Sequence, residues 1–434
     1  MSLDWLAGQA APLRGVITVP GDKSISHRAL ILAAIAQGCS RIDGFLEGED
    51  TRATARILTQ LGVRIDAPAP SERVVHGVGL DGLVGTDEDL DCGNAGTGMR
   101  LLAGLLAGQS FSSRLVGDAS LSARPMGRVI APLTAMGARI DAREGGLPPL
   151  IIHSNYSIQP IDYKVPVASA QVKSAILLAA LYAPGETIVR EPHPTRDYTE
   201  RMLAAFGWPL TFEPGLVRLS GRHRLHAIDV SVPSDFSSAA FFLVAASLIP
   251  GSELIVKRVG MNPRRTGLLT ALRLMGADIS ALNPAEHGGE TVADLRVRHA
   301  PLHGIDVPEA LVPDMIDEFP ALFVAACLAS GTTRIDGAAE LRVKESDRLA
   351  SMANALSTLG ASILETPAGA IIEGGVLRGG CVHSRGDHRI AMSLAIAGQC
   401  AVGEVRIGDC ANVDTSFPGF LEMATTCGFS LKVA

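Results

Sequence analysis

The stretch Leu58-Thr59-Gln60-Leu61-Gly62-Val63-Arg64-Ile65 recurs along the chain in the form Leu-x-x-(large apolar)-Gly-x-x-(Ile or Leu). Further copies run from Leu133 to Ile140, Leu203 to Leu210, Leu272 to Ile279 and Leu356 to Ile363, and a degenerate sixth copy surrounds Gly428. The six glycines are 68 to 84 residues apart. A glycine in this position ends a helix in a left-handed conformation, and a short strand follows. The repeat therefore predicts six similar structural units.

Each unit also opens alike, with a polar segment followed by a helix rich in Ala, Leu and Ile. The six openings are Gly21-Asp22-Lys23-Ser24, Gly93-Asn94-Ala95-Gly96-Thr97, Ala168-Ser169-Ala170-Gln171, Pro233-Ser234-Asp235-Phe236-Ser237, Pro313-Asp314-Met315-Ile316-Asp317 and Gly386-Asp387-His388-Arg389. Five of the six helices that follow are apolar nearly all round, which is typical of a buried helix. We therefore predict an α/β fold of β-α-β-α-β-β units, each with one buried helix and one more polar helix.

Composition limits the class of protein. A chain of 434 residues is long enough for two domains, and it contains no apolar run long enough to span a membrane. Its start lacks the pattern of a secretion signal. The seven cysteines have no short paired spacing, so we expect reduced thiols in a cytoplasmic protein and no metal site.

The charge distribution limits the ligands. A net charge of −7 and an aromatic content of 4% argue against nucleic-acid binding. Helix N-termini favour anions, and several openings carry cations or amides, including Lys23, Arg28, Asn94, Gln171 and Arg389. If these helix starts face one cleft, small substrates with phosphates and carboxylates are the expected ligands. Neither glycine-rich segment is a nucleotide motif, because the P-loop spacing and the acidic ribose anchor are both missing.

Four segments together resemble the signatures of the 5-enolpyruvylshikimate-3-phosphate synthase family. They are Gly21-Asp22-Lys23-Ser24-Ile25-Ser26-His27-Arg28, Gly93-Asn94-Ala95-Gly96-Thr97, Leu341-Arg342-Val343-Lys344-Glu345-Ser346-Asp347-Arg348 and Gly386-Asp387-His388-Arg389-Ile390-Ala391-Met392. The resemblance implies two inside-out α/β barrel domains of three repeats each, formed by residues 1–20 with 231–434 and by residues 21–230. It places the active site in the interdomain cleft.

The family reaction transfers the enolpyruvyl group of phosphoenolpyruvate to the 5-hydroxyl of shikimate 3-phosphate and releases phosphate, without a metal or organic cofactor. We expect those two substrates as partners, glyphosate as an inhibitor, a monomeric state, and no nucleic acid or membrane partner. The resemblance assigns shikimate 3-phosphate binding to Lys23, Ser24, Arg28, Ser169, Gln171, Arg196, Asp317 and Lys344. It assigns phosphoenolpyruvate binding to Lys23, Gly96, Arg124, Gln171, Arg348 and Arg389, and catalysis to Lys23, Asp317 and Glu345.

Several of these residues have ordinary structural alternatives. The run from Lys344 to Arg348 resembles a solvated helix face, and Asp317 resembles a helix cap. Arg124 is compatible with a surface loop. His388 is compatible with a core histidine and stays outside the catalytic set.

The sequence departs from the better-known bacterial and plant members at Ala170, Leu101 and Thr415, where those members have Ser, Pro and Lys. These choices resemble a second bacterial subclass that includes glyphosate-tolerant members. Gly96 is nevertheless kept, so we expect glyphosate to bind.

Two other functions remain as alternatives. A UDP-N-acetylglucosamine enolpyruvyl transferase would share the fold, but it typically has Asn after the opening Lys and a cysteine acid in a mobile loop, where this chain has Ser24 and Arg124. A non-catalytic anion-binding repeat protein would need neither Asp317 nor Glu345.

Overall fold

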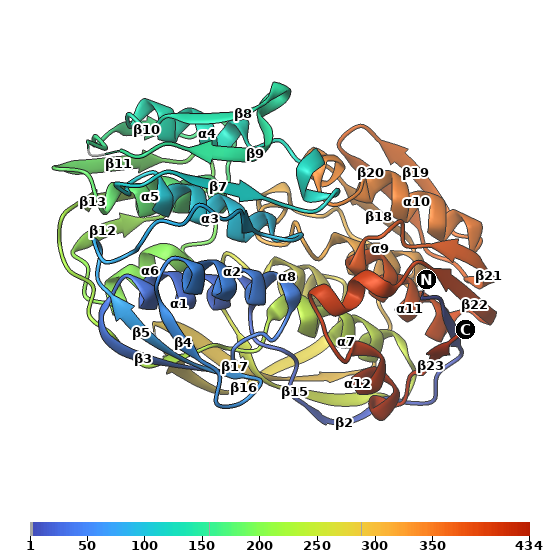
Figure 1. The fold of residues 1–434 in the computed structure, drawn as a ribbon. Helices are drawn as coiled ribbons and strands as arrows, with labels where there is room; N and C mark the ends of the chain where they lie inside the picture. The colour runs from blue at the N-terminus through green and yellow to red at the C-terminus, as the bar shows by residue number, and fades with distance from the viewer. Residues whose placement is uncertain (1–2, 156, 288) are drawn as a thin grey trace. The chain divides into compact units, whose positions relative to one another are not determined.

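The computed structural model describes residues 3–155, 157–287 and 289–434. Two compact units divide the chain. The first consists of Met1–Pro20, Pro233–Ala285 and Thr291–Ala434, and the second consists of Gly21–Val232 and Glu286–Glu290. The fold of the described residues is mixed α/β, as the sequence predicts, and its elements run from α1 to α12 and from β1 to β23 (Figure 1).

The sheets described in the second unit share one topology. Their strand orders are β14(Val230–Ser231)-β3(Gln37–Asp43)-β5(Glu72–Val78)-β4(Arg64–Asp66), β6(Leu90–Asp91)-β7(Ser113–Val116)-β9(Leu147–Ile152)-β8(Ile140–Arg143) and β10(Asp162–Lys164)-β11(Glu186–Arg190)-β13(Leu216–Ser220)-β12(Leu210–Glu213). In each sheet the first two strands are parallel and the remaining pairs are antiparallel. The parallel pairs β6–β7 and β10–β11 are each joined through a buried helix, as a parallel crossover requires, whereas the antiparallel pairs β4–β5, β8–β9 and β12–β13 are joined by short connections.

The sheets described in the first unit follow a similar plan. Their strand orders are β16(Asp278–His287)-β17(Glu290–Arg298)-β15(Glu253–Gly260)-β2(Arg14–Ile17), β18(Thr332–Ile335)-β20(Gly369–Glu373)-β19(Ser362–Thr366) and β21(Arg378–His383)-β22(Val402–Gly408)-β1(Trp5–Gly8)-β23(Ser430–Val433). Strand β1 lies between β22 and β23 and is antiparallel to both, so the two ends of the chain lie side by side (Figure 1). Strand β2 is parallel to β15. The N-terminal segment therefore completes two sheets of this unit.

Six helices begin within or just after the predicted openings and are almost wholly buried. They are α1(Lys23–Ala34), α3(Gly96–Leu106) and α5(Ala170–Ala180) in the second unit, and α7(Phe236–Leu248), α9(Phe319–Leu328) and α11(His388–Cys400) in the first. In the second unit α3 packs against α1 and α5, and in the first unit α7, α9 and α11 pack against one another. Each unit has its own apolar core built around these helices, because a helix that is apolar all round must be covered on every side.

A second set of six helices is less buried, and each of these helices ends within two residues of one of the repeat glycines. These helices are α2(Glu49–Gln60), α4(Gly127–Ala135), α6(Tyr198–Ala205), α8(Gly267–Leu274), α10(Arg348–Thr358) and α12(Phe420–Cys427). The glycine after each helix has a φ between 84° and 111°, and a strand follows. The prediction of left-handed glycines between helix and strand is confirmed at all six positions.

Two further properties follow from the described residues. None of their helices combines the length and the apolar character that a membrane crossing requires. The seven cysteines form no disulfide, and Cys92, Cys327, Cys410 and Cys427 are buried.

Candidate active site

Side-chain caps fix the starts of three helices that carry predicted site residues. The Asp22 carboxylate accepts a hydrogen bond of 2.8 Å from the backbone N–H of Ile25 and caps α1. Ser169 caps α5 through the N–H of Val172, and Asp387 caps α11 through the N–H of Arg389 at 2.9 Å. Such caps hold the first helical turn in one conformation, so the polar residues of that turn have defined positions.

Two predicted cations of α1 differ in their surroundings. The ammonium of Lys23 lies 2.7 Å from the carboxylate of Asp50 on α2, and its side chain is partly exposed. The Arg28 guanidinium is buried and donates to Thr199 Oγ1 at 2.7 Å, to Ser174 Oγ at 2.8 Å and to the carbonyl of Ser24 at 2.9 Å. Arg28 therefore also ties α1 to α5 and α6.

Burial lowers the pKa of Arg28 to about 10, and the charge of Glu200 opposes that shift. The nearby charge of Arg196, a half-buried residue in the loop before α6, lowers the same pKa. Arg28 nevertheless stays protonated at neutral pH, since about 10 is well above 7.

Hydrogen bonds link the starts of α3 and α5. Arg100 Nη1 donates to Gln171 Oε1 at 2.7 Å, and Gln171 Nε2 donates to Thr97 Oγ1 at 2.9 Å. A Cβ atom built on Gly96 would lie 3.2 Å from Nη1 of Arg100 and 3.2 Å from Nη1 of Arg124. The backbone of Gly96 is therefore flanked by two guanidinium groups. Through Arg100, these contacts link Gly96, Arg124 and Gln171, which the family resemblance assigned to one ligand.

Arg124 is oriented by residues that were not assigned to either substrate. Its Nη2 atom donates to Asn94 Oδ1 at 2.6 Å and to Ser120 Oγ at 3.1 Å, and Asn94 in turn donates to Asp118 at 2.8 Å. Because Arg124 is oriented by these bonds, it is not a plain surface-loop residue.

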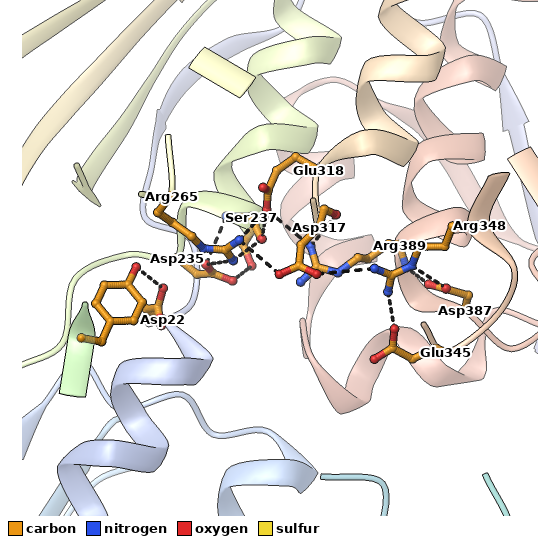
Figure 2. Close-up of polar contacts among 12 residues, drawn as sticks. Asp22, Asp235, Ser237, Arg265, Asp317, Glu318, Glu345, Arg348, Asp387 and Arg389 are labelled. Carbon is orange, nitrogen blue, oxygen red and sulfur yellow. Dashed lines mark hydrogen bonds and ion pairs between the residues drawn. The ribbon is translucent and has the colours of Figure 1, made fainter. Parts of the chain in front are cut away.

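In the first unit, Asp317 lies among three arginines (Figure 2). Its Oδ1 atom is 3.6 Å from Arg348 Nη1, and its Oδ2 atom is 3.4 Å from Arg265 Nη1. Arg389 Nη1 donates to the backbone carbonyl of Asp317 at 3.0 Å. The residue in the cap position of α9 is Glu318, one residue later. Asp317 is therefore placed by ion pairs in addition to any local role at the helix start.

Arg348 is the centre of an acidic cluster. Its Nε atom donates to Asp387 Oδ2 at 2.8 Å, and its Nη2 atom donates to Glu345 Oε2 at 2.6 Å (Figure 2). Burial alone would lower the pKa of Arg348, but the charges of Asp387, Glu345 and Asp317 raise it. Burial likewise opposes ionisation of Asp387, yet the charges of Arg348 and His388, together with the Arg348 hydrogen bond, lower the pKa of that carboxyl. Both groups are therefore charged at neutral pH.

The predicted run from Lys344 to Arg348 is not a solvated helix face. The 3-10 helix η4 (Ala339–Val343) precedes it, α10 begins only at Arg348, and the Arg348 side chain is buried. Burial lowers the pKa of Lys344, while the charge of Asp317 raises it. The alternative of a plain surface charge run was wrong, because Asp387 provides a buried partner from a distant part of the chain.

Some polar residues at these sites were missed by the sequence prediction. The residues without any predicted role are Asp50, Arg265 and Asp387, whereas Asn94 and Arg100 were noted as polar groups of a helix opening but received no ligand assignment. Asn94, Arg100 and Asp387 belong to or directly follow the quoted openings, so their position was a usable signal. Asp50 and Arg265 carry no comparable local signal.

Each unit thus presents cationic side chains at or near capped helix starts, and the first unit adds the carboxylates of Asp317 and Glu345 beside them. This combination is suited to binding small anions and to exchanging protons, as in an enzyme that acts on small anionic substrates.

Comparison with known proteins gives the family. The model of the EPSP synthase (3-phosphoshikimate 1-carboxyvinyltransferase) family matches residues 8–423. Relatives from Xanthomonas euvesicatoria pv. vesicatoria and Xanthomonas axonopodis pv. citri, both named 3-phosphoshikimate 1-carboxyvinyltransferase, are 65% identical over 99% of this chain and 98% of theirs. Two structures of EPSP synthase from Acinetobacter baumannii match with TM-scores of 0.91 and 0.90 at 47% and 45% identity, covering 100% of both chains. The chain belongs to the EPSP synthase family.

Proposed function

We propose that this protein transfers the enolpyruvyl group of phosphoenolpyruvate to the 5-hydroxyl of shikimate 3-phosphate and releases phosphate. Family membership over the whole chain supports the reaction. The observation that carries it is the contact of Arg348 with both Asp317 and Glu345, at 3.6 Å and 2.6 Å. A guanidinium that binds an anion and two carboxylates that exchange protons are the groups this reaction requires.

We assign the anionic groups of the substrates to the cations. Lys23, Ser24, Arg28, Ser169, Gln171 and Arg196 bind shikimate 3-phosphate, with Asp317 and Lys344 at its reacting hydroxyl. Lys23, Gly96, Arg124, Gln171, Arg348 and Arg389 bind phosphoenolpyruvate. Clustered cations offset the repulsion between the two polyanions, and guanidinium groups match carboxylate and phosphate in a bidentate way.

In the proposed mechanism, the carboxylates accept and donate the protons. In the addition step, Asp317 accepts the proton of the 5-hydroxyl as its oxygen attacks C2 of phosphoenolpyruvate, and a proton is added at C3. In the elimination step, C3 loses a proton and the C2–O bond to phosphate breaks, which regenerates the double bond. Glu345 and Lys23 are the proposed acid and base at C3. Lys344 is suited to bridge to the attacking hydroxyl, since its charge interacts with Asp317.

Finer features of the protein are proposals as well. The matching sheet topologies and the buried helices support an inside-out α/β barrel arrangement within each unit. The absence of disulfides among seven cysteines supports action in a reducing compartment such as the cytoplasm. A monomeric state is tested by light scattering on the purified protein.

The decisive experiment measures phosphate release from phosphoenolpyruvate with and without shikimate 3-phosphate, and identifies the carboxyvinyl product by mass spectrometry. We expect release only when shikimate 3-phosphate is present. UDP-N-acetylglucosamine serves as a control acceptor and should give no release. Phosphate release that is independent of shikimate 3-phosphate, or that needs the nucleotide sugar, would contradict the proposal.

A further inference from the structure

Arg265 is a buried arginine surrounded by acids, and the substrate contacts proposed above do not include it. Its Nη1 atom lies 2.9 Å from Glu318 Oε1 and 3.4 Å from Asp317 Oδ2. Its Nη2 atom lies 3.3 Å from Asp235 Oδ1 and also bonds to the hydroxyl of Ser237 (Figure 2). Its side chain is only 5% exposed. One guanidinium therefore serves three carboxylates from the starts of α7 and α9.

The backbone around Arg265 holds the guanidinium in place. It lies in the turn before α8, where the N–H of Arg265 donates to the carbonyl of Asn262 at 2.9 Å. On one side Arg264 pairs with Asp314 at 3.2 Å, and on the other the N–H of Gly267 donates to the Asp314 carbonyl at 3.2 Å. A Cβ atom on Gly267 would come within 3.0 Å of the Asp314 backbone, so the turn lies directly against the segment before α9. Arg265 and Asp317 are thus presented by two segments in fixed contact.

The two oxygens of Asp317 face different arginines. Oδ1 faces Arg348, which also binds Asp387 and Glu345, and Oδ2 faces Arg265. A guanidinium on each oxygen limits rotation of the carboxylate about its Cβ–Cγ bond. Without Arg265, the neighbouring acids Glu318 and Asp235 would repel Asp317 and favour its protonated form.

We propose that Arg265 is a positioning residue that orients the Asp317 carboxylate for its reaction with the substrate hydroxyl. This inference rests on the proposed function, because it assigns Arg265 a part in the step that Asp317 performs. Arg265 itself touches neither substrate in this scheme and acts only through Asp317. The charged groups that face this pair include Asp235, Glu318, Arg348, Arg389 and Lys344.

The test compares Arg265→Met, Arg265→Lys and a matched control, Arg264→Met, which removes a guanidinium from the same turn but leaves Asp317 with its partners. We expect Arg265→Met to lower kcat by about 100-fold, within the range of general acid–base effects, with KM for phosphoenolpyruvate changed by less than about threefold. Arg265→Lys should recover part of the loss, since a charge remains. Arg264→Met should keep kcat near the value of the unmodified protein.

Two further readouts separate positioning from a loss of folded protein. The acid limb of the kcat–pH profile should move to higher pH in Arg265→Met, since loss of a neighbouring cation raises a carboxyl pKa. The double variant Asp317→Asn/Arg265→Met is compared with Asp317→Asn alone. Its kcat should be lower by less than about threefold, because Arg265 acts through Asp317 and that residue is already inactive. If Arg265→Met fails to fold, Arg265→Lys replaces it in the single and double variants.

These measurements separate a failure of the positioning role of Arg265 from a failure of the proposed enzymatic activity. If the unmodified protein turns over normally while the Arg265 variants keep its kcat and pH profile, the inference is overturned and the proposed function stands. The inference is also overturned if the fold-loss of kcat in the double variant equals the product of the fold-losses in Arg265→Met and Asp317→Asn. If the unmodified protein shows no turnover that depends on shikimate 3-phosphate, the proposed function fails, and the inference fails with it.

Discussion

A Cβ atom at Gly96 would lie 3.2 Å from Nη1 of Arg124, closer than most side chains tolerate. Arg124 is held by Asn94 and Ser120, so it can move away from an added methyl group only by disturbing these hydrogen bonds. We therefore expect Gly96→Ala to displace Arg124 and to raise both KM for phosphoenolpyruvate and the inhibition constant of glyphosate by at least about tenfold, as small displacements of positioning groups do. Steady-state kinetics with glyphosate as a competing ligand measures both constants.

Gly127→Ala is the matched control, because a Cβ atom at Gly127 meets no atom within 4 Å. It should leave both constants unchanged. A glyphosate inhibition constant that does not rise in Gly96→Ala would contradict the steric explanation.

A buried triad in the second unit should control its stability. Lys173 Nζ lies 2.7 Å from Glu191 and 2.8 Å from Glu200, and all three side chains are at most 3% exposed. Burial raises the pKa of Glu200 although Lys173 opposes the shift. Lys173→Met would leave two buried carboxylates without their cation, at a cost of about 3–5 kcal/mol in unfolding free energy. Urea unfolding followed by circular dichroism measures the change.

Two variants test the cause of that loss. Arg190→Met removes an exposed ion pair with Asp162 in the same unit and should change the urea midpoint far less. Adding Glu200→Gln to Lys173→Met should restore part of the stability, because one of the two uncompensated charges is removed. A midpoint for Lys173→Met equal to that of Arg190→Met would rule out a stabilising triad.

How far the sequence predicts this protein depends on the range of each interaction. Helix starts, buried helices and the glycines at 62 and 360 were predicted correctly because caps, periodicity and left-handed turns are local properties. The insertion of β1 between β22 and β23 was not predicted, since its partners lie about 400 residues away along the chain.

The candidate site divides in the same way. The helix starts that carry Lys23, Gly96 and Arg389 were found from the repeat and from the family resemblance. Arg265 was missed because the side chains that it contacts lie 28 or more positions away, and nothing in its own turn marks it as part of a site. Arg348 is buried against Asp387, which lies 39 positions away along the chain. The local charge pattern alone therefore favoured a solvent-exposed helix face.

The Asp387–Arg348 pair should make stability depend on pH. Burial opposes the charge of Asp387, but Arg348 and the nearby charge of His388 keep the pKa of the carboxyl below its usual value of about 3.9. A carboxyl with a lowered pKa contributes stability above that usual value, and the contribution is lost as pH falls through the lower, folded-state value. Asp387→Asn should therefore cost about 3 kcal/mol at pH 7 and at pH 5, and the difference should narrow below about pH 4. Urea midpoints at each pH measure it.

Asp347→Asn is the control for that effect. Asp347 also caps a helix and pairs with an arginine, Arg342 at 2.9 Å, but its side chain is 38% exposed. We expect a much smaller loss at every pH, because solvent screens the pair. Equal losses in the two variants would show that capping, and not the buried ion pair, accounts for the stability.

Glu345 is the proposed acid and base at C3, and its exchange with solvent protons makes this testable. Its carboxylate bonds to Arg348 Nη2 at 2.6 Å, and its side chain is about one-third exposed at 31%, so Glu345→Gln should fold normally. We expect kcat to fall by about 10²–10⁴-fold, the usual range when an acid–base group is removed. In deuterated water with shikimate 3-phosphate, the unmodified protein should exchange deuterium into C3 of phosphoenolpyruvate, and the variant should do so far more slowly.

The controls for this prediction separate proton transfer from charge. Glu345→Asp keeps an acid at a shorter reach and should recover part of the exchange, whereas Glu404→Gln, an exposed substitution on β22, should behave as the unmodified protein. The remaining candidate at C3 is Lys23. If Glu345→Gln exchanges C3 hydrogens at the normal rate while turnover is slow, the proton at C3 comes from Lys23, and Glu345 acts only by holding Arg348 in place.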